Sequence, residues 1–237
     1  WLVSAEVLKD VRSTGGKAAV TMQVLEEAKH FVVLRELIQS FGVEVRRQSV
    51  WEYLLLEQVL KAEGLEKFFG MNVIVEGIAL SLFGLLCDLP GMEILKLFHL
   101  DESRHTALPI NYFKDFPMTA WQKHNLRARW RRLLLVLPAI PLIFHLEEAA
   151  AELGFDAFDF GGSVFRKVTF LSNRAGFYLL VPSDWVGAAL NQAFNTYCFA
   201  TREGHTYRNF LKAETTVGDA ELAIENPIFN MPLTTAS

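Results

Sequence analysis

Apolar residues recur every three or four positions over most of this chain, which is the spacing of a helix with one buried face. The clearest example runs from about residue 18 to residue 41, where one broad apolar face is made by Val20, Val24, Ala28, Phe31, Leu34 and Ile38. The alternation of apolar and polar residues that is typical of strands is weak throughout the chain. The pattern therefore predicts an all-α protein.

Turn residues divide this pattern into helices of ordinary length. Breaks are expected at Ser13–Gly16, Gly42, Gly64 and Asp88–Gly91, since glycine and proline end helices. Between these breaks and beyond them, we expect helices at about 1–12, 18–41, 44–62, 65–87, 92–113, 120–137, 139–153, 162–181 and 183–213.

The length of 237 residues suits a single domain that can bury a hydrophobic core. We expect a metal-binding helical bundle at 1–113, a helical extension at 114–213 and an irregular tail at 214–237. The net charge is −4 and no long stretch is strongly basic, so we do not expect nucleic-acid binding. The two cysteines lie far apart in apolar runs, which excludes a disulfide scaffold and favours a reducing compartment such as the cytoplasm.

The mean hydropathy of +0.21 is high, so a membrane segment has to be considered. No uninterrupted apolar run reaches the roughly 20 residues that span a bilayer, because Glu76 interrupts Ile74–Cys87. The apolar run Leu133–Leu146 follows a basic stretch, Arg127–Arg132, and contains two prolines. A buried or oligomer-interface helix is expected there, with a helix on a membrane surface as the alternative. The excess of apolar residues favours a homodimer.

Two segments contain a Glu followed three residues later by a His: Glu27 with His30, and Glu102 with His105. Residues three apart share one face of a helix, so each pair can present a carboxylate oxygen and an imidazole nitrogen to one metal ion. The alternative is that these are ordinary helix residues on solvated faces.

Glu76 is the strongest argument for a metal. It is the single charged residue in the apolar stretch Val73–Leu80, and burying it there without a cation would be costly. If the helices on either side of the break at Asp88–Gly91 are antiparallel, Glu76 lies level with Glu102. Glu6 and Glu27 match less well across the first break, with a mismatch of roughly 4 to 5 Å at helical rise. Glu6 is therefore the weakest member of the set.

One Glu from each of two helices, together with a Glu-x-x-His pair from each of two others, resembles the ferritin-like carboxylate-bridged di-iron proteins. The residues that carry this resemblance are Glu6, Glu27, His30, Glu76, Glu102 and His105. The resemblance implies a ferritin-like four-helix bundle with additional C-terminal helices, and two iron ions, with Mn/Fe or Mn/Mn pairs as alternatives. It also implies that Asp101 hydrogen-bonds the metal-bound His30, and that Glu26 is its counterpart in the first motif.

Carboxylate oxygens combined with imidazole nitrogens suit iron or manganese better than copper or zinc. His99 lies three residues before Glu102, near the same helix face. It is either a packed or hydrogen-bonded residue or an additional nitrogen ligand. No catalytic group is expected beyond the metal ligands.

The apolar residues around such a site are expected to exclude water and to accept an apolar substrate. The expected pocket residues are Phe31, Leu34, Ile78, Ala79 and Phe98, with Gly77 leaving space beside Glu76. The resemblance implies a non-haem di-iron oxygenase or oxidase that uses dioxygen to hydroxylate or N-oxygenate a small, mostly apolar substrate. The sequence has no flavin or ferredoxin motif, so electrons would come from a separate partner.

Other members of the superfamily fit less well. Leu34 stands where the radical-bearing Tyr of the ribonucleotide reductase small subunit is typically found, so radical storage is not expected. A ferroxidase or iron-handling protein is a less favoured alternative, because a long apolar and aromatic segment follows the second Glu-x-x-His pair. The alternative from another class is a non-catalytic helical protein that binds a partner, a lipid or a membrane surface.

Overall fold

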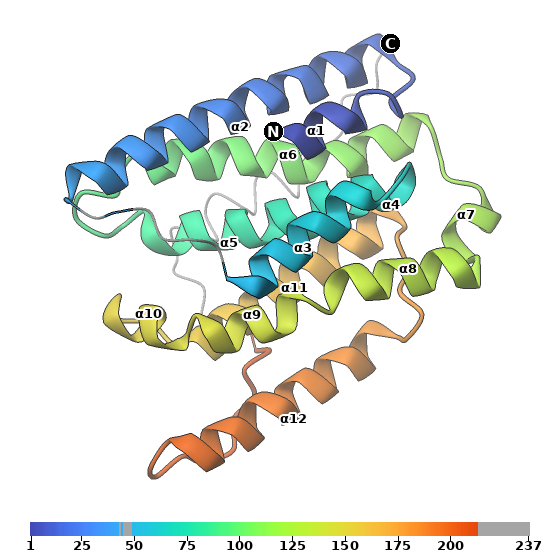
Figure 1. Ribbon diagram of the computed structural model, residues 1–237. Coiled ribbons are helices and arrows are strands. Elements are labelled where there is room, and N and C mark those ends of the chain that lie inside the picture. The colour runs from blue at the N-terminus through green and yellow to red at the C-terminus, as the bar shows by residue number, and fades with distance from the viewer. Residues whose placement is uncertain (43, 45–48, 213–237) are drawn as a thin grey trace.

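The computed structural model describes residues 1–42, 44 and 49–212, and these residues form helices and turns with no strand among them (Figure 1). The prediction of an all-α protein is confirmed. The predicted tail at 214–237 lies outside the described residues, as do residues 43 and 45–48 near the start of the predicted helix at 44–62.

The helices follow one another along the chain with short connections. Their bounds are α1 (Leu2–Val7), α2 (Thr14–Ser40), α3 (Val50–Lys61), α4 (Leu65–Phe68), the π-helix η1 (Phe69–Val75), α5 (Glu76–Leu86), α6 (Leu95–Asp115), α7 (Ala120–His124), α8 (Leu126–Val136), α9 (Ala139–His145), α10 (Glu147–Glu152), α11 (Ala157–Ala175) and α12 (Ser183–Thr201).

Side-chain caps explain several boundaries that differ from the prediction. The expected helix at 120–137 is two helices, because the side chain of Asn125 accepts backbone N–H groups and starts α8 anew. The helix expected at 162–181 begins earlier, where the Asp156 carboxylate accepts the N–H of Phe158 at 2.8 Å. It also ends earlier, because Gly176 adopts the left-handed conformation with φ 81°.

Three further boundaries differ. The first expected helix ends at Val7 instead of residue 12, and the helix expected at 139–153 is divided into α9 and α10 at Leu146. The helix expected at 183–213 ends at Thr201. The apolar period thus predicts where a helix forms, whereas the residues at which the helix begins and ends depend on capping groups and packing.

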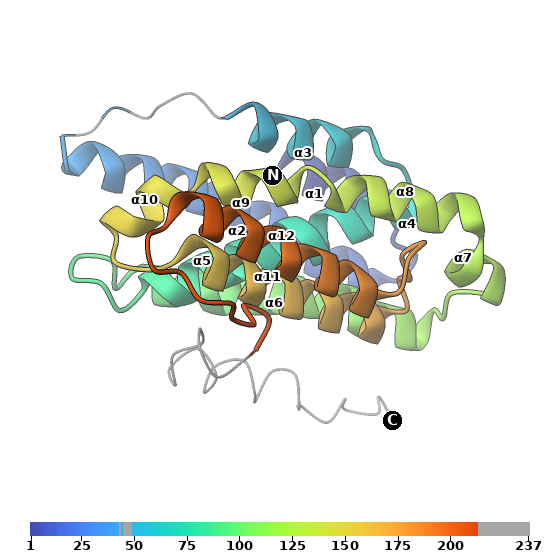
Figure 2. The ribbon, with the colours of Figure 1, turned by 90° about the horizontal axis from the view of Figure 1, so that it is seen from below.

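The long helices are stacked in layers (Figures 1 and 2). Helix α5 lies at the centre and packs chiefly on α6 and α11, while α6 also contacts α2. Helices α3, α8 and α9 pack against one another on one side, and α12 lies outermost against α11. The core of the bundle therefore includes α11, which comes from the C-terminal half of the chain.

Helices α4, η1 and α5 form one apolar stretch through the centre. Among the described residues, Leu65–Leu86 is the one helical segment long and apolar enough to cross a membrane. However, 61% of an 18-residue apolar part of it is buried inside the fold, as in the core helix of a globular protein. A Cβ atom on Gly77 would lie 3.1 Å from a methyl group of Val168, so α5 and α11 approach closely at this glycine. Val168 therefore fills the space that Gly77 was expected to leave for a substrate.

Candidate metal centre

Three helices bring acidic and imidazole side chains together at one point inside the bundle. Glu27 comes from α2, Glu76 is the first residue of α5, and Glu102 and His105 come from α6. One possible ligand atom from each of these four residues lies within 4.8 Å of the others. Glu76, Glu102 and His105 are buried, and Glu27 is partly buried.

His30 belongs to the same group. Its Nδ1 atom lies 3.2 Å from Glu102 Oε1, while Nδ1 of His105 lies 3.1 Å from the other oxygen of Glu102. Nδ1 of His105 is also 3.2 Å from Glu27 Oε1. We call the five residues the carboxylate–histidine cluster: Glu27, His30, Glu76, Glu102 and His105.

Both imidazoles are held from outside by a carboxylate. His30 Nε2 lies 3.0 Å from Asp101 Oδ2, and His105 Nε2 lies 2.8 Å from Glu26 Oε2. Each outer nitrogen can donate to its carboxylate, so Nδ1, the nitrogen that faces the cluster, is the one that a metal ion would take once it is deprotonated. An outer carboxylate of this kind commonly fixes the ring of a metal-bound histidine and raises its basicity.

The two outer carboxylates are ionised. Burial acts to raise the pKa of Asp101, but its bonds with Lys29 and His30 outweigh burial and lower the pKa. Burial likewise opposes the net lowering of the Glu26 pKa, which comes from hydrogen bonds with His105 and Arg104. Both carboxylates can therefore accept an imidazole N–H at neutral pH.

Inside the cluster, the pKa values of Glu76 and Glu27 are shifted in the opposite direction. Burial and the neighbouring Glu102 raise the pKa of Glu76 to about 8. Burial and the nearby Glu76 also raise the pKa of Glu27. Burial alone would lower the pKa of His105, yet hydrogen bonds to the surrounding carboxylates raise it. Carboxylates crowded together without enough positive charge behave in this way.

Two buried ligand-type atoms in the cluster, Glu27 Oε1 and His30 Nδ1, form no hydrogen bond of good geometry among the described residues, although each lies 3.2 Å from another polar atom of the cluster. Buried polar atoms are normally satisfied, so atoms left without partners call for an explanation. A metal ion bound between them would satisfy both. Three carboxylates and two imidazoles also form a donor set that fits iron or manganese.

Two buried amides support the cluster and were not anticipated from the sequence. Gln23 Nε2 donates to Glu76 Oε1 at 2.6 Å, and Asn72 Nδ2 donates to Gln23 Oε1 at 2.9 Å and to the His105 carbonyl at 3.0 Å. Each amide lies four residues before a cluster Glu, so helical spacing was the signal that could have found them. Asn72 lies in η1, and π-helical turns often mark functional sites.

Glu6 does not reach the cluster, contrary to the ligand set predicted from the sequence. Its carboxylate is largely exposed and pairs with Nζ of the buried Lys67, which lowers the pKa of Glu6. The physical reason is that α1 ends at Val7 and packs against α2, α3 and α4. The acids that meet in the described structure come from three helices instead of four.

His99 is fully buried but lies outside the group of closely spaced ligand atoms. Its Nδ1 atom is 2.9 Å from the Leu80 carbonyl, and burial lowers its pKa. The structure thus shows the hydrogen-bonded arrangement for His99, which was one of the two alternatives.

The predicted pocket residues are distributed over different surroundings. The Phe98 ring packs on His30 at 4.2 Å between centroids, and Leu34 and Ala79 pack against the apolar group that contains Phe98. Phe31 is half exposed and contacts Trp1, so it is not a buried pocket residue in the described structure. Ile78 lines an apolar cavity between α5, α9 and α11. Phe83, which was not anticipated, also contacts the His30 ring.

No family model, curated protein or solved structure matches this chain. Functional inference therefore rests on the geometry and chemistry of the described residues.

Proposed function

We propose that this chain is a ferritin-like, non-haem di-iron oxygenase or oxidase that uses dioxygen to hydroxylate or N-oxygenate a small, mostly apolar substrate. The observation that carries the proposal is the carboxylate–histidine cluster, in which the ligand atoms of Glu27, Glu76, Glu102 and His105 lie within 4.8 Å of one another. His30, 3.2 Å from Glu102, adds the second imidazole. Manganese in one or both positions is the alternative to iron.

Charge supports a metal pair over an ordinary polar core. Two ferrous ions carry four positive charges, and the three cluster carboxylates neutralise most of that charge. The ionised Glu26 and Asp101, on the far side of the two imidazoles, add further negative charge. Without cations, the protein keeps protons on the raised-pKa groups Glu76 and His105 instead.

Each residue of the site would have a definite part in this proposal. Glu27, Glu76 and Glu102 would hold the metal through carboxylate oxygens, and His30 and His105 through Nδ1, while Asp101 and Glu26 hold their outer nitrogens. Gln23 fixes one oxygen of Glu76. Phe83 and Phe98 cover His30 and exclude water. Bound iron would supply the electrons that reduce dioxygen, and a separate redox protein would replenish them.

Metal binding has to displace protons from this site. Glu76, with a pKa of about 8, and His105, with a raised pKa, both hold protons at neutral pH when no metal is bound. Ligands must be deprotonated to bind, so metal affinity will increase with pH.

The proposal extends to the setting of the protein. Cys87 and Cys198 are both buried and unpaired, which suits a reducing compartment such as the cytoplasm. Exposed apolar side chains on α2, including Leu25 and Val32, support a homodimer.

The first test is metal content per chain, measured by mass spectrometry on protein purified without added metal and again after anaerobic iron reconstitution. We expect about two iron or manganese ions per chain, lost in both Glu76→Ala and His105→Ala. Glu147→Ala, which removes an acid paired with Arg202, is the matched control and should retain the metal. Oxygen consumption with candidate apolar substrates would follow.

Two outcomes would contradict the proposal. Little metal in reconstituted wild type, with both variants folded, would favour a non-catalytic helical binding protein. Iron loading far beyond two ions per chain in a large assembly would favour a ferroxidase or storage protein.

A further inference from the structure

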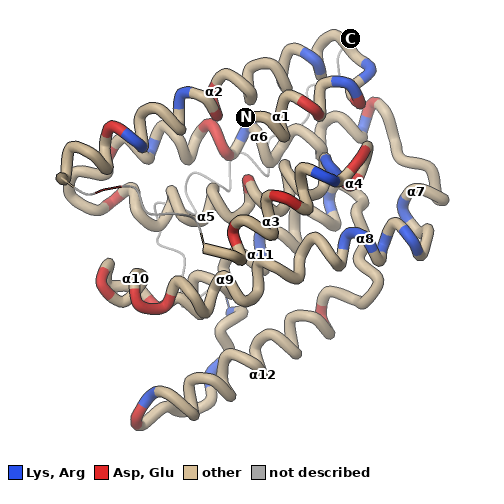
Figure 3. Tube along the Cα trace, in the orientation of Figure 1, with Lys and Arg blue, Asp and Glu red and all other residues tan. Residues whose placement is uncertain are grey.

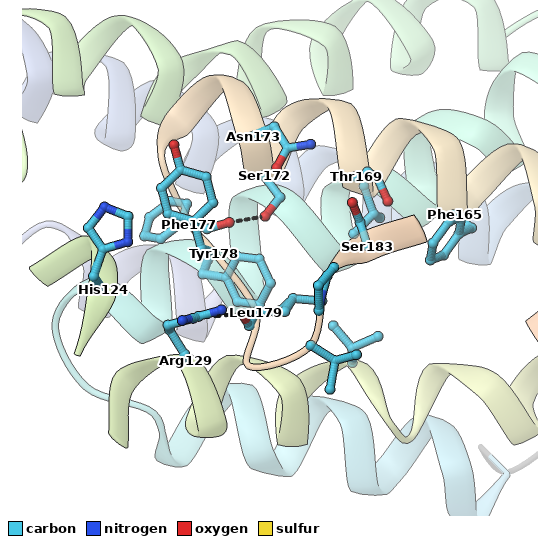
Figure 4. Close-up of a pocket in the computed structure, with 15 residues that line it drawn as sticks. His124, Arg129, Phe165, Thr169, Ser172, Asn173, Phe177, Tyr178, Leu179 and Ser183 are labelled. Atoms are coloured by element: carbon cyan, nitrogen blue, oxygen red, sulfur yellow. Dashed lines mark hydrogen bonds between the residues drawn. The ribbon is translucent and has the colours of Figure 1, made fainter. Parts of the chain in front are cut away.

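A separate pocket lies between α8, α11 and the segment that leads into α12 (Figure 4). Its volume is about 300 Å³, at the small end of the range for pockets that bind organic ligands. None of the residues of the carboxylate–histidine cluster lines it. The pocket is therefore a second candidate binding site, distinct from the proposed metal centre.

Arg129 gives this pocket a fixed positive charge. Its Nε donates to the Leu179 carbonyl at 2.7 Å, and one terminal nitrogen donates to the Leu180 carbonyl at 3.2 Å, which hold the guanidinium at the wall. No Asp or Glu lines the pocket, and within the described part of the chain Arg129 forms no ion pair with a carboxylate. Lys and Arg also gather along α7 and α8 (Figure 3). The pocket thus offers a positioned cation without a protein anion.

The start of α12 lies at the pocket through Ser183, and the acidic Asp184 of the same turn does not line it. Helix α12 has 19 residues and begins at Ser183, which lines the pocket, and Pro182 before it provides no side-chain cap. The first N–H groups of a helix lack intrahelical partners and carry partial positive charge. Figure 4 shows Ser183 across the pocket from His124.

Apolar side chains form one wall of the pocket, beside the polar side chains of Thr169, Ser172 and Asn173. Phe69, Val136, Phe165 and Val168 all line the pocket. The last three also line an adjoining cavity of about 60 Å³, whose walls are apolar side chains and glycine. The two spaces therefore share one apolar wall, with Arg129 beside the larger one only.

We propose that this pocket binds a small carboxylic acid with an apolar body. The carboxylate pairs with Arg129 near the start of α12, and the apolar body lies along Val136 and Val168. The ligand does not reach the metal centre by this route, because Ile74 and Ile78 of the adjoining cavity lie two residues on either side of Glu76 and so on the opposite helix face. The acid is a second ligand of the protein.

The test is isothermal titration calorimetry of the purified full chain with octanoate, and with 1-octanol as the uncharged counterpart. We expect saturable octanoate binding that is at least about tenfold weaker in Arg129→Gln, because charge-assisted hydrogen bonds are lost. The matched control is Arg127→Gln on the same helix, which does not line the pocket and should bind as wild type. Octanol should bind more weakly than octanoate.

Two further variants keep the test decisive. Ser183→Glu places an acid in the first turn of α12, where it is compatible with the helix but repels a carboxylate. It should therefore weaken octanoate binding about tenfold. This variant tests the site even if Arg129→Gln does not fold. Glu102→Gln in the carboxylate–histidine cluster should leave octanoate binding unchanged. Binding lost in Glu102→Gln but not in Ser183→Glu would place the acid at the metal centre and overturn the proposal. Equal binding of octanoate and octanol, or no saturable binding, would also overturn it.

Discussion

The carboxylate–histidine cluster and the acids around the start of α11 are both partly or fully buried, but only the second group is paired with arginines. In that group, Arg202 lies 2.7 Å from Glu147 and 2.6 Å from Asp156, and Arg208 lies 2.7 Å from Asp159. We call these residues the arginine-paired acids. In the cluster, the carboxylates face one another and two imidazoles.

The pKa of Asp156 follows this difference, whereas burial raises the pKa of Asp159 despite its pairing with Arg208. Burial acts to raise the pKa of Asp156, but the bonds from Arg202 and the Phe158 N–H lower it. In the cluster, burial and Glu102 raise the pKa of Glu76 to about 8. The arginine-paired acids meet arginines of the chain, whereas among the described residues Glu76 faces no Lys or Arg, and only His105, 3.7 Å away, can carry a positive charge beside it. The cluster, unlike the arginine-paired acids, therefore has room for the positive charge of a metal ion.

The largest expected effect is an opposite pH dependence of the two groups in the metal-free protein. Glu76 and His105 hold protons more tightly folded than unfolded, so the free energy of unfolding will fall as the pH rises from about 5 to about 8. The total is several kcal/mol, at about 1.4 kcal/mol per pKa unit. Asp156, with a lowered pKa, contributes stability above pH 3.8 that is lost as the pH falls further.

Urea unfolding from pH 3 to 9 measures the free energy of unfolding across both ranges, the decline above about pH 5 and the loss at low pH. Glu76→Gln should reduce the decline above about pH 5 and leave the loss of stability at low pH unchanged. Asp156→Asn should reduce the loss at low pH only, because Asp101 and Glu26 also have lowered pKa values. A decline above pH 5 that is unchanged in Glu76→Gln would show that the cluster does not hold these protons.

The second expected effect is a loss of stability at the arginine-paired acids. Arg202→Ala removes the partner of Glu147 and Asp156 and should lower the free energy of unfolding by about 2 kcal/mol. Metal content should not change. Arg35→Ala, which removes an exposed pair with Glu36, is the control and should change stability by less than about 1 kcal/mol. Loss of metal in Arg202→Ala would mean that the two groups are not independent.

The third effect concerns the outer carboxylates of the cluster. Asp101→Asn keeps the shape but loses the charge that holds His30 Nε2, so metal affinity should fall about tenfold or more. Competition with a chromophoric chelator measures the affinity. Glu36→Gln, an exposed change on α2, should have no effect, and an Asp101→Asn affinity equal to wild type would remove Asp101 from the site.

The smallest effect is expected at Glu6. Because its carboxylate pairs with Lys67 away from the cluster, Glu6→Gln should leave metal content unchanged. The metal content of Glu6→Gln is measured by mass spectrometry and compared with that of Glu27→Gln, which should lose metal. Metal loss in Glu6→Gln would restore it as a ligand and require α1 to move.

The all-α class and the approximate position of α2 could be predicted from the apolar period. The buried face of α2 could not, because its buried residues are Val20, Gln23 and His30, whereas Phe31 of the predicted face is half exposed. Helix ends could not, since Asn125 restarts a helix and Gly176 ends one through local hydrogen bonding and backbone conformation. The Glu-x-x-His pairs could also be predicted, because the spacing along one helix decides which side chains share a face.

The spacing along single helices therefore fixes the pairs Glu27–His30 and Glu102–His105, and the apolar stretch around Glu76 makes its burial unfavourable. The contacts of Asp101 with His30 and of Glu26 with His105 were already implied by the resemblance, whereas the packing of the helices alone places Gln23, and not Glu6, against Glu76. The physical reason is that contacts within one helix follow from its repeat, whereas contacts between helices depend on how α1, α2, α5 and α6 pack. That packing is set by the whole core.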